Sequence, residues 1–315
     1  MNLLRLIVRE AKYRSALLGV YLIRRLPSLL VLGILRPLAA LAFLLDPFHR
    51  RVALTQMRSA LGRPVDWPLV LKVFMNEVDI LVDAVRYAYM SDEEIRARVK
   101  VEGKGHLDEA LASGRGLMMI TGHIGNWEIL SHIPRLLGTQ FCVMADVRAD
   151  ERLESIVDSI RSRSGATILP PKGKALMLIR ELKKGHTIGM VVDNRGDKKD
   201  SLFCDVLGMP APTNPAPAFI AMKGNALVLP VYAVKRQGGY TIRFSRAVDA
   251  QSFGNGQEAI QGLSDFMQSW VSDVVKDHPD QWFWLYSRWV RRPEMRRIVK
   301  QRLDFKEYVI RQAEK

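Results

Sequence analysis

The chain has 315 residues, of which 48% are hydrophobic and 25% are charged, and its formal net charge is +14. This length allows one large domain or two modest ones with a substantial core, and the composition is that of a globular protein rather than a disordered one. The surplus of positive charge favours an anionic partner, which could be nucleic acid, an anionic membrane surface, or an acidic protein or lipid.

The N-terminal region contains an apolar segment over residues 26–45, which reads LPSLLVLGILRPLAALAFLL. It is about long enough to span a bilayer, but Arg36 and Pro37 near its middle disfavour a spanning helix. No small-residue cleavage site follows, so we do not interpret it as a removed signal. Basic residues flank it on both sides: Arg5, Arg9, Lys12, Arg14, Arg24, Arg25, Arg50 and Arg51. We therefore expect a membrane-associating segment, interfacial or spanning, and the alternative is an ordinary buried helix pair.

Residues 1–98 are predicted to form a helical N-terminal region. Apolar residues recur at i, i+3 and i+4 over residues 50–61 and 67–90, which predicts two amphipathic helices with a turn between them. Ser91 followed by Glu94 predicts the capping box of a further helix.

Short apolar runs alternate with helical patterns in residues 99–315. The runs predict strands at 116–121, 141–146, 166–170, 186–193, 226–236 and 240–248. The helical patterns lie at 126–138, 150–163, 174–185, 214–224 and 256–279. This order predicts an α/β domain with a mixed, largely parallel sheet flanked by helices.

The two cysteines, Cys142 and Cys204, lie in apolar runs without CxxC spacing. We expect two buried free thiols, and a disulfide or a catalytic cysteine is the alternative. The six histidines and two cysteines are scattered, so the sequence predicts no metal site.

Polar residues follow three of the predicted strands, at the edge where functional groups gather in open α/β sheets. These strand ends read Thr121-Gly122-His123, Asp146-Val147-Arg148 and Asp193-Asn194-Arg195. At the first of them, a helix that begins near Asn126 would place Glu128 in its first turn, behind His123. The carboxylate could then accept a hydrogen bond from one imidazole nitrogen and leave the other free as a general base. In the alternative interpretation Glu128 complements the helix dipole and His123 is an ordinary loop residue.

No nucleophile accompanies this histidine, because the chain has no GxSxG motif and Ser162 and Ser164 lie among arginines. A base without a protein nucleophile predicts direct attack by a substrate hydroxyl. Arginines near the strand ends could hold an anionic substrate, or they could form a solvated face: Arg148, Arg161, Arg163 and Arg195.

Several blocks together resemble the lipid A biosynthesis acyltransferases, the late lauroyl/myristoyl-type enzymes within the lysophospholipid acyltransferase superfamily. GHIGNWE (122–128) is similar to the family's HxxxxD/E motif. The other similar blocks, in chain order, are residues 44–61, 160–197, 207–232 and HPDQWFWLYSRWVRRP at 278–293. The resemblance covers roughly residues 15–295.

The resemblance implies roles for particular residues. It makes His123 the catalytic base and Glu128 its partner. It assigns Arg161, with Arg163 as the nearby alternative, and Asp193 to the remaining polar positions of the catalytic site, where they position substrate or support the oxyanion pocket. Substrate contacts are expected from Arg163, Arg148 and Asn126. The chain departs from the family pattern at Asn194, at Val206-Leu207 and at Tyr286, which leaves the acceptor and the acyl-chain length open.

The resemblance also implies a reaction and a place for it. The acyl donor would be an acyl carrier protein thioester or acyl-CoA. The acceptor would be an anionic glycolipid, a lipid A precursor, at the cytoplasmic face of the inner membrane, and no cofactor or metal would be needed. The same chemistry on another glycolipid or a lysophospholipid is the alternative. A nucleic-acid-binding protein is disfavoured because base-stacking aromatics are not interleaved with the positive charge, and a catalytically silent membrane scaffold is disfavoured by His123 and Glu128.

Overall fold

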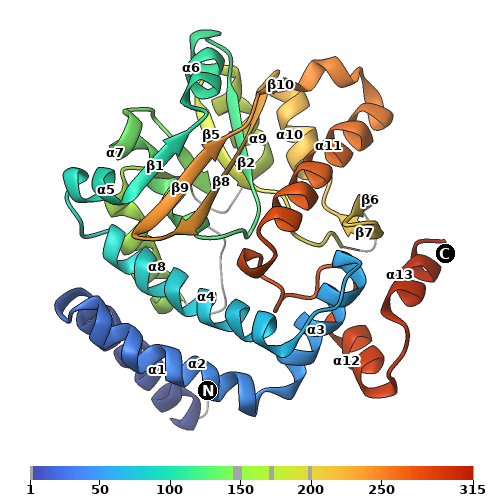
Figure 1. The fold of residues 1–315 in the computed structure, drawn as a ribbon. Coiled ribbons are helices and arrows are strands. Elements are labelled where there is room, and N and C mark those ends of the chain that lie inside the picture. Colours follow the sequence, from blue (N-terminus) through green and yellow to red (C-terminus); the bar gives the residue numbers. More distant parts are fainter. Residues whose placement is uncertain (1–2, 145–150, 170–173, 198–200, 315) are drawn as a thin grey trace.

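The computed structural model describes residues 3–144, 151–169, 174–197 and 201–314. Helices precede, interrupt and follow the strands (Figure 1). The α-helices are α1 (Leu3–Arg25), α2 (Ser28–Leu45), α3 (Pro47–Leu61), α4 (Trp67–Tyr87), α5 (Asp92–Arg98), α6 (Lys104–Ala112), α7 (Ile133–Leu137), α8 (Glu151–Arg161), α9 (Lys174–Lys183), α10 (Ala216–Lys223), α11 (Gly256–Asp277), α12 (Arg292–Gln301) and α13 (Phe305–Ala313). Short 3₁₀ turns are η1 (Trp127–His132), η2 (Ser162–Ser164), η3 (Ala250–Phe253) and η4 (Pro279–Gln281).

The strands form one large mixed sheet and one small ribbon. They are β1 (Val99–Glu102), β2 (Leu117–Thr121), β3 (Cys142–Met144), β4 (Thr167–Leu169), β5 (Thr187–Val191), β6 (Leu202–Val206), β7 (Met209–Thr213), β8 (Leu227–Arg236), β9 (Gly239–Phe244) and β10 (Val248–Asp249). The large sheet has the order β1-β9-β8-β2-β5-β3-β4, with β10 paired to β8. Only β8 with β9 and β8 with β10 pair antiparallel within its described strands. The predicted α/β fold with a largely parallel sheet is therefore confirmed.

Helices cover both faces of this sheet because its central strands are apolar on both sides. Alternate residues of β2, such as Met118 and Ile120, belong to the core that α9, α10 and α11 complete. Leu117 and Met119 point into a second core formed with α5, α6, η1 and α7. β2 is buried along its whole length. Its burial makes the end of β2 a rigid place from which to present a side chain.

Helix α4 lies between the sheet and the N-terminal helix pair, with α1 and α2 on its outer side (Figure 1). The charge in the middle of α2 explains this arrangement. Arg36 donates two hydrogen bonds to the buried Asp79 of α4, at 3.1 and 2.9 Å, and Lys235 of β8 pairs with the same carboxylate at 2.5 Å. Arg36, whose charge disfavours a spanning helix, therefore attaches α2 to the α/β domain.

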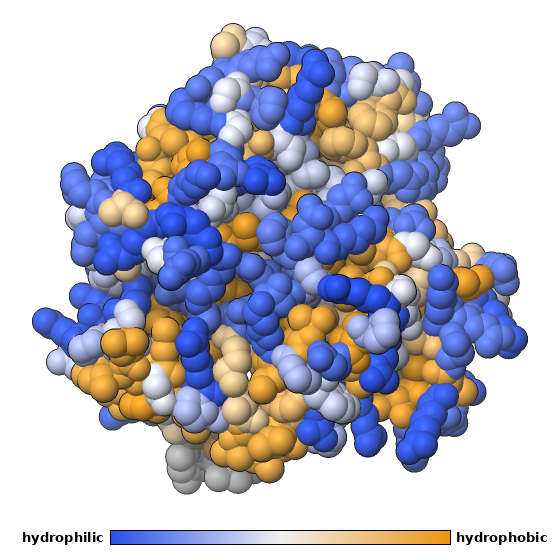
Figure 2. All heavy atoms as spheres, in the orientation of Figure 1, coloured by the Kyte–Doolittle hydropathy of each residue, from blue (hydrophilic) through white to orange (hydrophobic). Residues whose placement is uncertain are grey.

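The opposite side of α2 is apolar and exposed. Leu29 is 86% exposed and Leu45 is 73% exposed, whereas Val31, Ala39 and Phe43 are buried. Further exposed residues on α1 and α2 are Leu17, Leu18, Tyr21, Leu22, Leu30, Ile34, Leu38, Leu41 and Leu44. Apolar side chains are visible along the lower edge of the molecule, where these helices lie (Figure 2). By length and composition α2 could cross a membrane, although such a helix is also found in soluble cores and signal sequences.

The local predictions agree with the structure at most elements. Ser91 and Glu94 form the expected capping box. Both cysteines are free, and Cys204 is buried as expected, whereas Cys142 is only half-buried. The sequence missed the β6–β7 ribbon. The residues expected to form one helix over 126–138 instead form the 3₁₀ turn η1 followed by the short α7.

Candidate active site

His123 and Asp193 meet at the carboxyl ends of two neighbouring strands. β2 ends at Thr121, and its parallel neighbour β5 ends at Val191. The pairing continues one step beyond β5, because the N–H of Val192 donates to the carbonyl of Thr121 at 2.8 Å. Parallel strands place their carboxyl ends at the same edge of a sheet, so the two side chains come together there although 70 residues separate them.

The Asp193 carboxylate holds His123 at two points. Its Oδ1 lies 2.8 Å from the imidazole Nδ1, and its Oδ2 accepts the backbone N–H of His123, also at 2.8 Å. The indole N–H of Trp282 donates to the same Oδ2 at 2.7 Å. The Asp193 side chain is 2% exposed and that of His123 is 27% exposed. With Nδ1 engaged by a buried carboxylate, Nε2 is the ring nitrogen left to accept a proton.

The loop after His123 is attached to the C-terminal segment that carries Trp282. The N–H of Gly125 donates to the carbonyl of Gln281 at 2.6 Å, and the N–H of Phe283 donates to the carbonyl of His123 at 3.1 Å. Gly125 has φ of +54°, and a Cβ at this position would lie 2.0 Å from the carbonyl oxygen of Ala233. Only glycine fits this conformation and this close approach.

Electrostatics favour opposite charges on the two partners. Burial lowers the pKa of His123, but the charge and hydrogen bond of Asp193, with smaller contributions from Glu77 and Glu128, outweigh it and raise the pKa above its usual 6.5. Burial raises the pKa of Asp193, but its contacts with His123 and Trp282 outweigh burial and leave the pKa below its usual value. The imidazole is therefore a stronger base than an ordinary histidine.

The sequence predicted that Glu128 would accept the hydrogen bond from His123, and the structure differs. Glu128 forms a two-pronged ion pair with Arg161, with nitrogen–oxygen distances of 2.9 and 2.5 Å. The Nδ1 position is taken by Asp193. The physical reason is the sheet order, because β5 lies directly beside β2 and delivers Asp193 to the imidazole, while the tight turn η1 points Glu128 toward the end of α8. Glu128 still acts on the imidazole through its charge.

The other predicted site residues are placed as follows. Arg161 lies at the site through its pair with Glu128, and this pair raises the pKa of the guanidinium. Arg163 is exposed and stacks on Tyr89, with 4.4 Å between the guanidinium carbon and the ring centre. Asn126 is fully buried, and its substrate contact stays a prediction. Arg148 lies outside the described residues.

Sequence reasoning missed two residues that act on the His123–Asp193 pair, namely Trp282 and Glu77. Trp282 was part of a recognised C-terminal block, but no pattern indicated that its indole reaches Asp193. Glu77 of α4 is half-buried near the imidazole, and burial raises its pKa to about 7 against the lowering effect of His123. The ring of Trp127, whose centre lies 4.8 Å from that of His123, covers another side of the imidazole.

The arrangement suits proton abstraction without a protein nucleophile. The hydrogen-bond and ring partners of the His123 side chain among the described residues are Asp193, Trp127 and Phe283, and no serine or cysteine is one of them. No group of three or more metal-ligating side chains is found in the described part of the chain. A buried carboxylate, an imidazole with a raised pKa and a partly open Nε2 make a general base for a hydroxyl that comes from outside the protein.

Comparisons with known proteins identify the family of this chain. Two curated phosphatidylinositol mannoside acyltransferases of Mycobacterium tuberculosis, from strains H37Rv and CDC 1551, are each 25% identical to this chain over 195 residues. The match spans 60% of this chain and 60% of each relative. The crystal structure of the 1-acyl-sn-glycerophosphate acyltransferase PlsC of Thermotoga maritima matches 80% of this chain and 97% of that one, with 15% identity and a TM-score of 0.39. The model of the bacterial lipid A biosynthesis acyltransferases matches residues 6–291. The chain therefore belongs to the bacterial lipid A biosynthesis acyltransferase family.

Proposed function

We propose that this protein is an O-acyltransferase that moves a fatty acyl chain from an acyl carrier protein thioester to a hydroxyl of a lipid A precursor. The observation that carries the proposal is the histidine at the end of β2, held by the buried Asp193 with one ring nitrogen left open. Family membership supports the acyl transfer chemistry, and the histidine supplies its base.

The reaction follows from these groups. As the acceptor hydroxyl attacks the thioester carbonyl, its proton moves to Nε2 of His123, and the resulting imidazolium is stabilised by Asp193. The tetrahedral oxyanion then collapses, the carbon–sulfur bond breaks, and the imidazolium returns the proton to the leaving thiolate. Arg161, held in place by Glu128, supplies positive charge near this centre and supports the oxyanion or an anionic part of the substrate.

Charge and surface support the expected partners. A chain with a net charge of +14 attracts both an acidic carrier protein and a phosphorylated lipid. The exposed apolar side of α1 and α2 suits burial in a lipid surface, with basic residues around it. Because Arg36 binds Asp79, we place α2 in the membrane interface rather than across the bilayer. In this proposal the protein binds the cytoplasmic face of the inner membrane.

A second acceptor has a specific observation in its favour. The curated relatives are named phosphatidylinositol mannoside acyltransferases, so a mannosylated glycolipid is the other candidate. Both acceptors are anionic glycolipids, and the same base would serve each of them.

Reconstitution distinguishes these acceptors and donors. The full-length protein in vesicles is given acyl carrier protein thioesters or acyl-CoA, with a lipid A precursor or a phosphatidylinositol mannoside as acceptor, and products are identified by mass spectrometry. The proposal expects the lipid A precursor to gain the mass of one acyl chain. Transfer only to the mannoside would support the second acceptor. Release of free fatty acid without transfer to either lipid would contradict an acyltransferase.

A further inference from the structure

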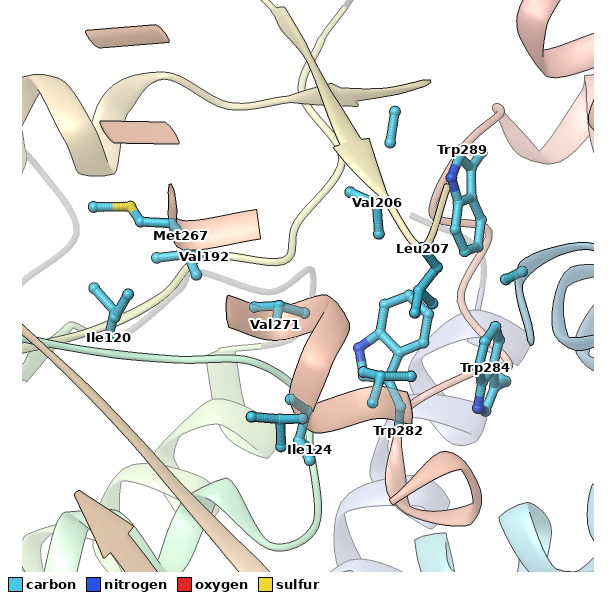
Figure 3. Close-up of a cluster of buried hydrophobic side chains, with 14 of the residues drawn as sticks. Ile120, Ile124, Val192, Val206, Leu207, Met267, Val271, Trp282, Trp284 and Trp289 are labelled. Atoms are coloured by element: carbon cyan, nitrogen blue, oxygen red, sulfur yellow. The ribbon is translucent and has the colours of Figure 1, made fainter. Parts of the chain in front are cut away.

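Trp282 donates to Asp193, the carboxylate that holds His123, and buried hydrogen bonds support the segment that carries this indole. Its side of the core also holds Trp284 and Trp289, and the three indoles lie side by side (Figure 3). The ring centres of Trp282 and Trp284 are 4.6 Å apart, and the two rings meet edge to face. Only Trp282 of the three contacts Asp193, through its N–H at 2.7 Å. The indole of Trp284 instead donates to the carbonyl of Pro279, also at 2.7 Å.

Gln56 of α3 holds the segment that carries Trp282. This side chain is fully buried, and its Nε2 donates to the carbonyls of Trp284 and Tyr286, both at 2.9 Å. Its Oε1 accepts the backbone N–H of Arg288 at 3.0 Å. One amide therefore satisfies three backbone groups of a segment with little regular structure of its own, which gives that segment a single conformation.

Arg288 adds further support through the residue before Asp193. Its guanidinium donates to the carbonyl of Pro212 at 2.6 Å, to the hydroxyl of Thr213 at 2.7 Å and to Oε1 of Gln268 at 3.2 Å. The Nε2 of Gln268 then donates to the carbonyl of Val192, the residue before Asp193, at 2.8 Å. The strand end and the indole that flank Asp193 are thus parts of one buried hydrogen-bonded unit.

We infer that Trp282 is a positioning residue for acyl transfer: its indole N–H holds the Asp193 carboxylate in the orientation that aligns His123, and Gln56 and Arg288 hold Trp282 in place. The catalytic meaning of this inference rests on the proposed function. Without the indole, Oδ2 keeps only the backbone N–H of His123 as a donor among the described groups, so the carboxylate is held less firmly than with both donors in place.

Loss of the indole N–H should shift the pKa of His123 in one direction. A hydrogen bond donated to a carboxylate stabilises its charged form and withdraws part of its charge from the imidazole. Removing the indole N–H makes Asp193 a stronger base and a stronger partner for the imidazolium, so the pKa of His123 rises. The other charged groups around the pair are unchanged by this substitution: Glu77 on α4, Glu128 on η1, Arg161 on α8, and Arg288 beside Asp193.

Three tryptophan-to-phenylalanine variants make a matched set for the test. Trp282→Phe removes the N–H at Asp193, Trp284→Phe removes an equally short bond to a carbonyl, and Trp289→Phe alters the same cluster at an indole N–H that is buried without a hydrogen-bond partner within the described residues. For each variant, the dependence of kcat/KM on pH and the ¹⁵N titration of the histidine rings are measured. The NMR titration does not depend on turnover, so it tests this inference even if the proposed reaction is wrong.

We expect Trp282→Phe to raise the pKa of His123 by about 0.5–1 unit and to move the midpoint of the acidic limb of the pH profile to higher pH by the same amount. We also expect kcat to fall about 10-fold or more. The two control variants should leave the His123 titration within about 0.2 unit of wild type, whatever their effect on stability. Equal shifts in all three variants, or an unchanged His123 titration in Trp282→Phe, would overturn the inference.

A second measurement covers the case in which Trp282→Phe does not fold. In Trp127→Phe, which removes the other indole beside His123, the indole resonances of the remaining tryptophans are followed with pH. The Trp282 resonance should titrate with the midpoint of His123, because its acceptor changes charge state with the pair. If no indole resonance follows that midpoint, Trp282 does not act on Asp193.

Discussion

Replacing Asp193 by asparagine is the sharpest perturbation of the site, because it keeps the shape and removes the charge. The carboxylate lies 2.8 Å from Nδ1 and is 2% exposed, so water does not replace it. At an effective dielectric constant of about 20, opposite charges about 4 Å apart attract by about 4 kcal/mol. If that attraction is lost when the imidazolium forms, turnover should fall about 10³-fold, since each 1.36 kcal/mol is about tenfold in rate. An asparagine amide can also hold the wrong tautomer of His123.

The dependence of activity on pH provides a second, independent test of the Asp193→Asn prediction. His123 must be unprotonated to act as a base, so activity rises as pH increases through its pKa. In wild type that pKa is above 6.5, because Asp193 outweighs burial. In Asp193→Asn the effect of burial remains and the attraction is gone, so the acidic limb should move to lower pH. This is opposite in direction to the shift expected for Trp282→Phe.

The matched comparison is Glu128→Gln, which also lowers turnover because it frees Arg161 and removes a second negative charge. Its effect on the Nδ1 hydrogen bond should be small, since Asp193 holds that atom. Steady-state rates across pH and ¹⁵N histidine spectra are recorded for both variants. If Glu128→Gln changes the tautomer of His123 while Asp193→Asn leaves it intact, Glu128 is the orienting carboxylate and the assignment of Asp193 is refuted.

Three further predictions follow from the fold. Replacing the exposed Leu29 and Ile34 by serine should weaken binding to anionic vesicles about 10-fold or more in flotation assays and leave the melting temperature nearly unchanged; unchanged binding would place the membrane contact elsewhere. Asp79→Asn should lower the free energy of unfolding in urea by about 1–3 kcal/mol, because Arg36 and Lys235 lose their shared carboxylate; the loss is moderate because both cations are partly exposed. No loss of stability would show that the Arg36–Asp79 ion pair does not hold α2. Gly125→Ala should destabilise it by about 2–4 kcal/mol because its Cβ would collide with Ala233, and a variant as stable as wild type would contradict the described turn.

Much of the fold was predictable because it depends on local patterns. The apolar run at 116–121 and the alternation of strands with helices indicated a buried, largely parallel sheet, and the structure confirms it. The β6–β7 ribbon was missed because Pro210 and Pro212 make β7 read as a loop. Proline is tolerated in an isolated ribbon, where one side of each strand has no neighbouring strand to receive an N–H.

The site was predictable only in part because it depends on the order of strands. His123 could be singled out from its place after a strand, and Asp193 from the same feature and from the family resemblance. That the two would touch requires β5 to be the neighbour of β2, which no local pattern reveals. Glu128 was near in sequence and therefore looked like the partner. Trp282 lies 89 residues beyond Asp193, and its role depends on contacts made by Gln56 from the other end of the chain.

The most direct test of the proposed function is a single-turnover acyl transfer with wild type and His123→Ala, both shown to be folded by circular dichroism and thermal melting. A radiolabelled acyl carrier protein thioester is mixed with excess enzyme and vesicles that contain the lipid A precursor, and labelled lipid is followed with time. Wild type should transfer its acyl chain to the lipid, whereas His123→Ala should fall by about 10³-fold or more because no group replaces the base. Transfer by His123→Ala at close to the wild-type rate would contradict the assignment of His123 as the base.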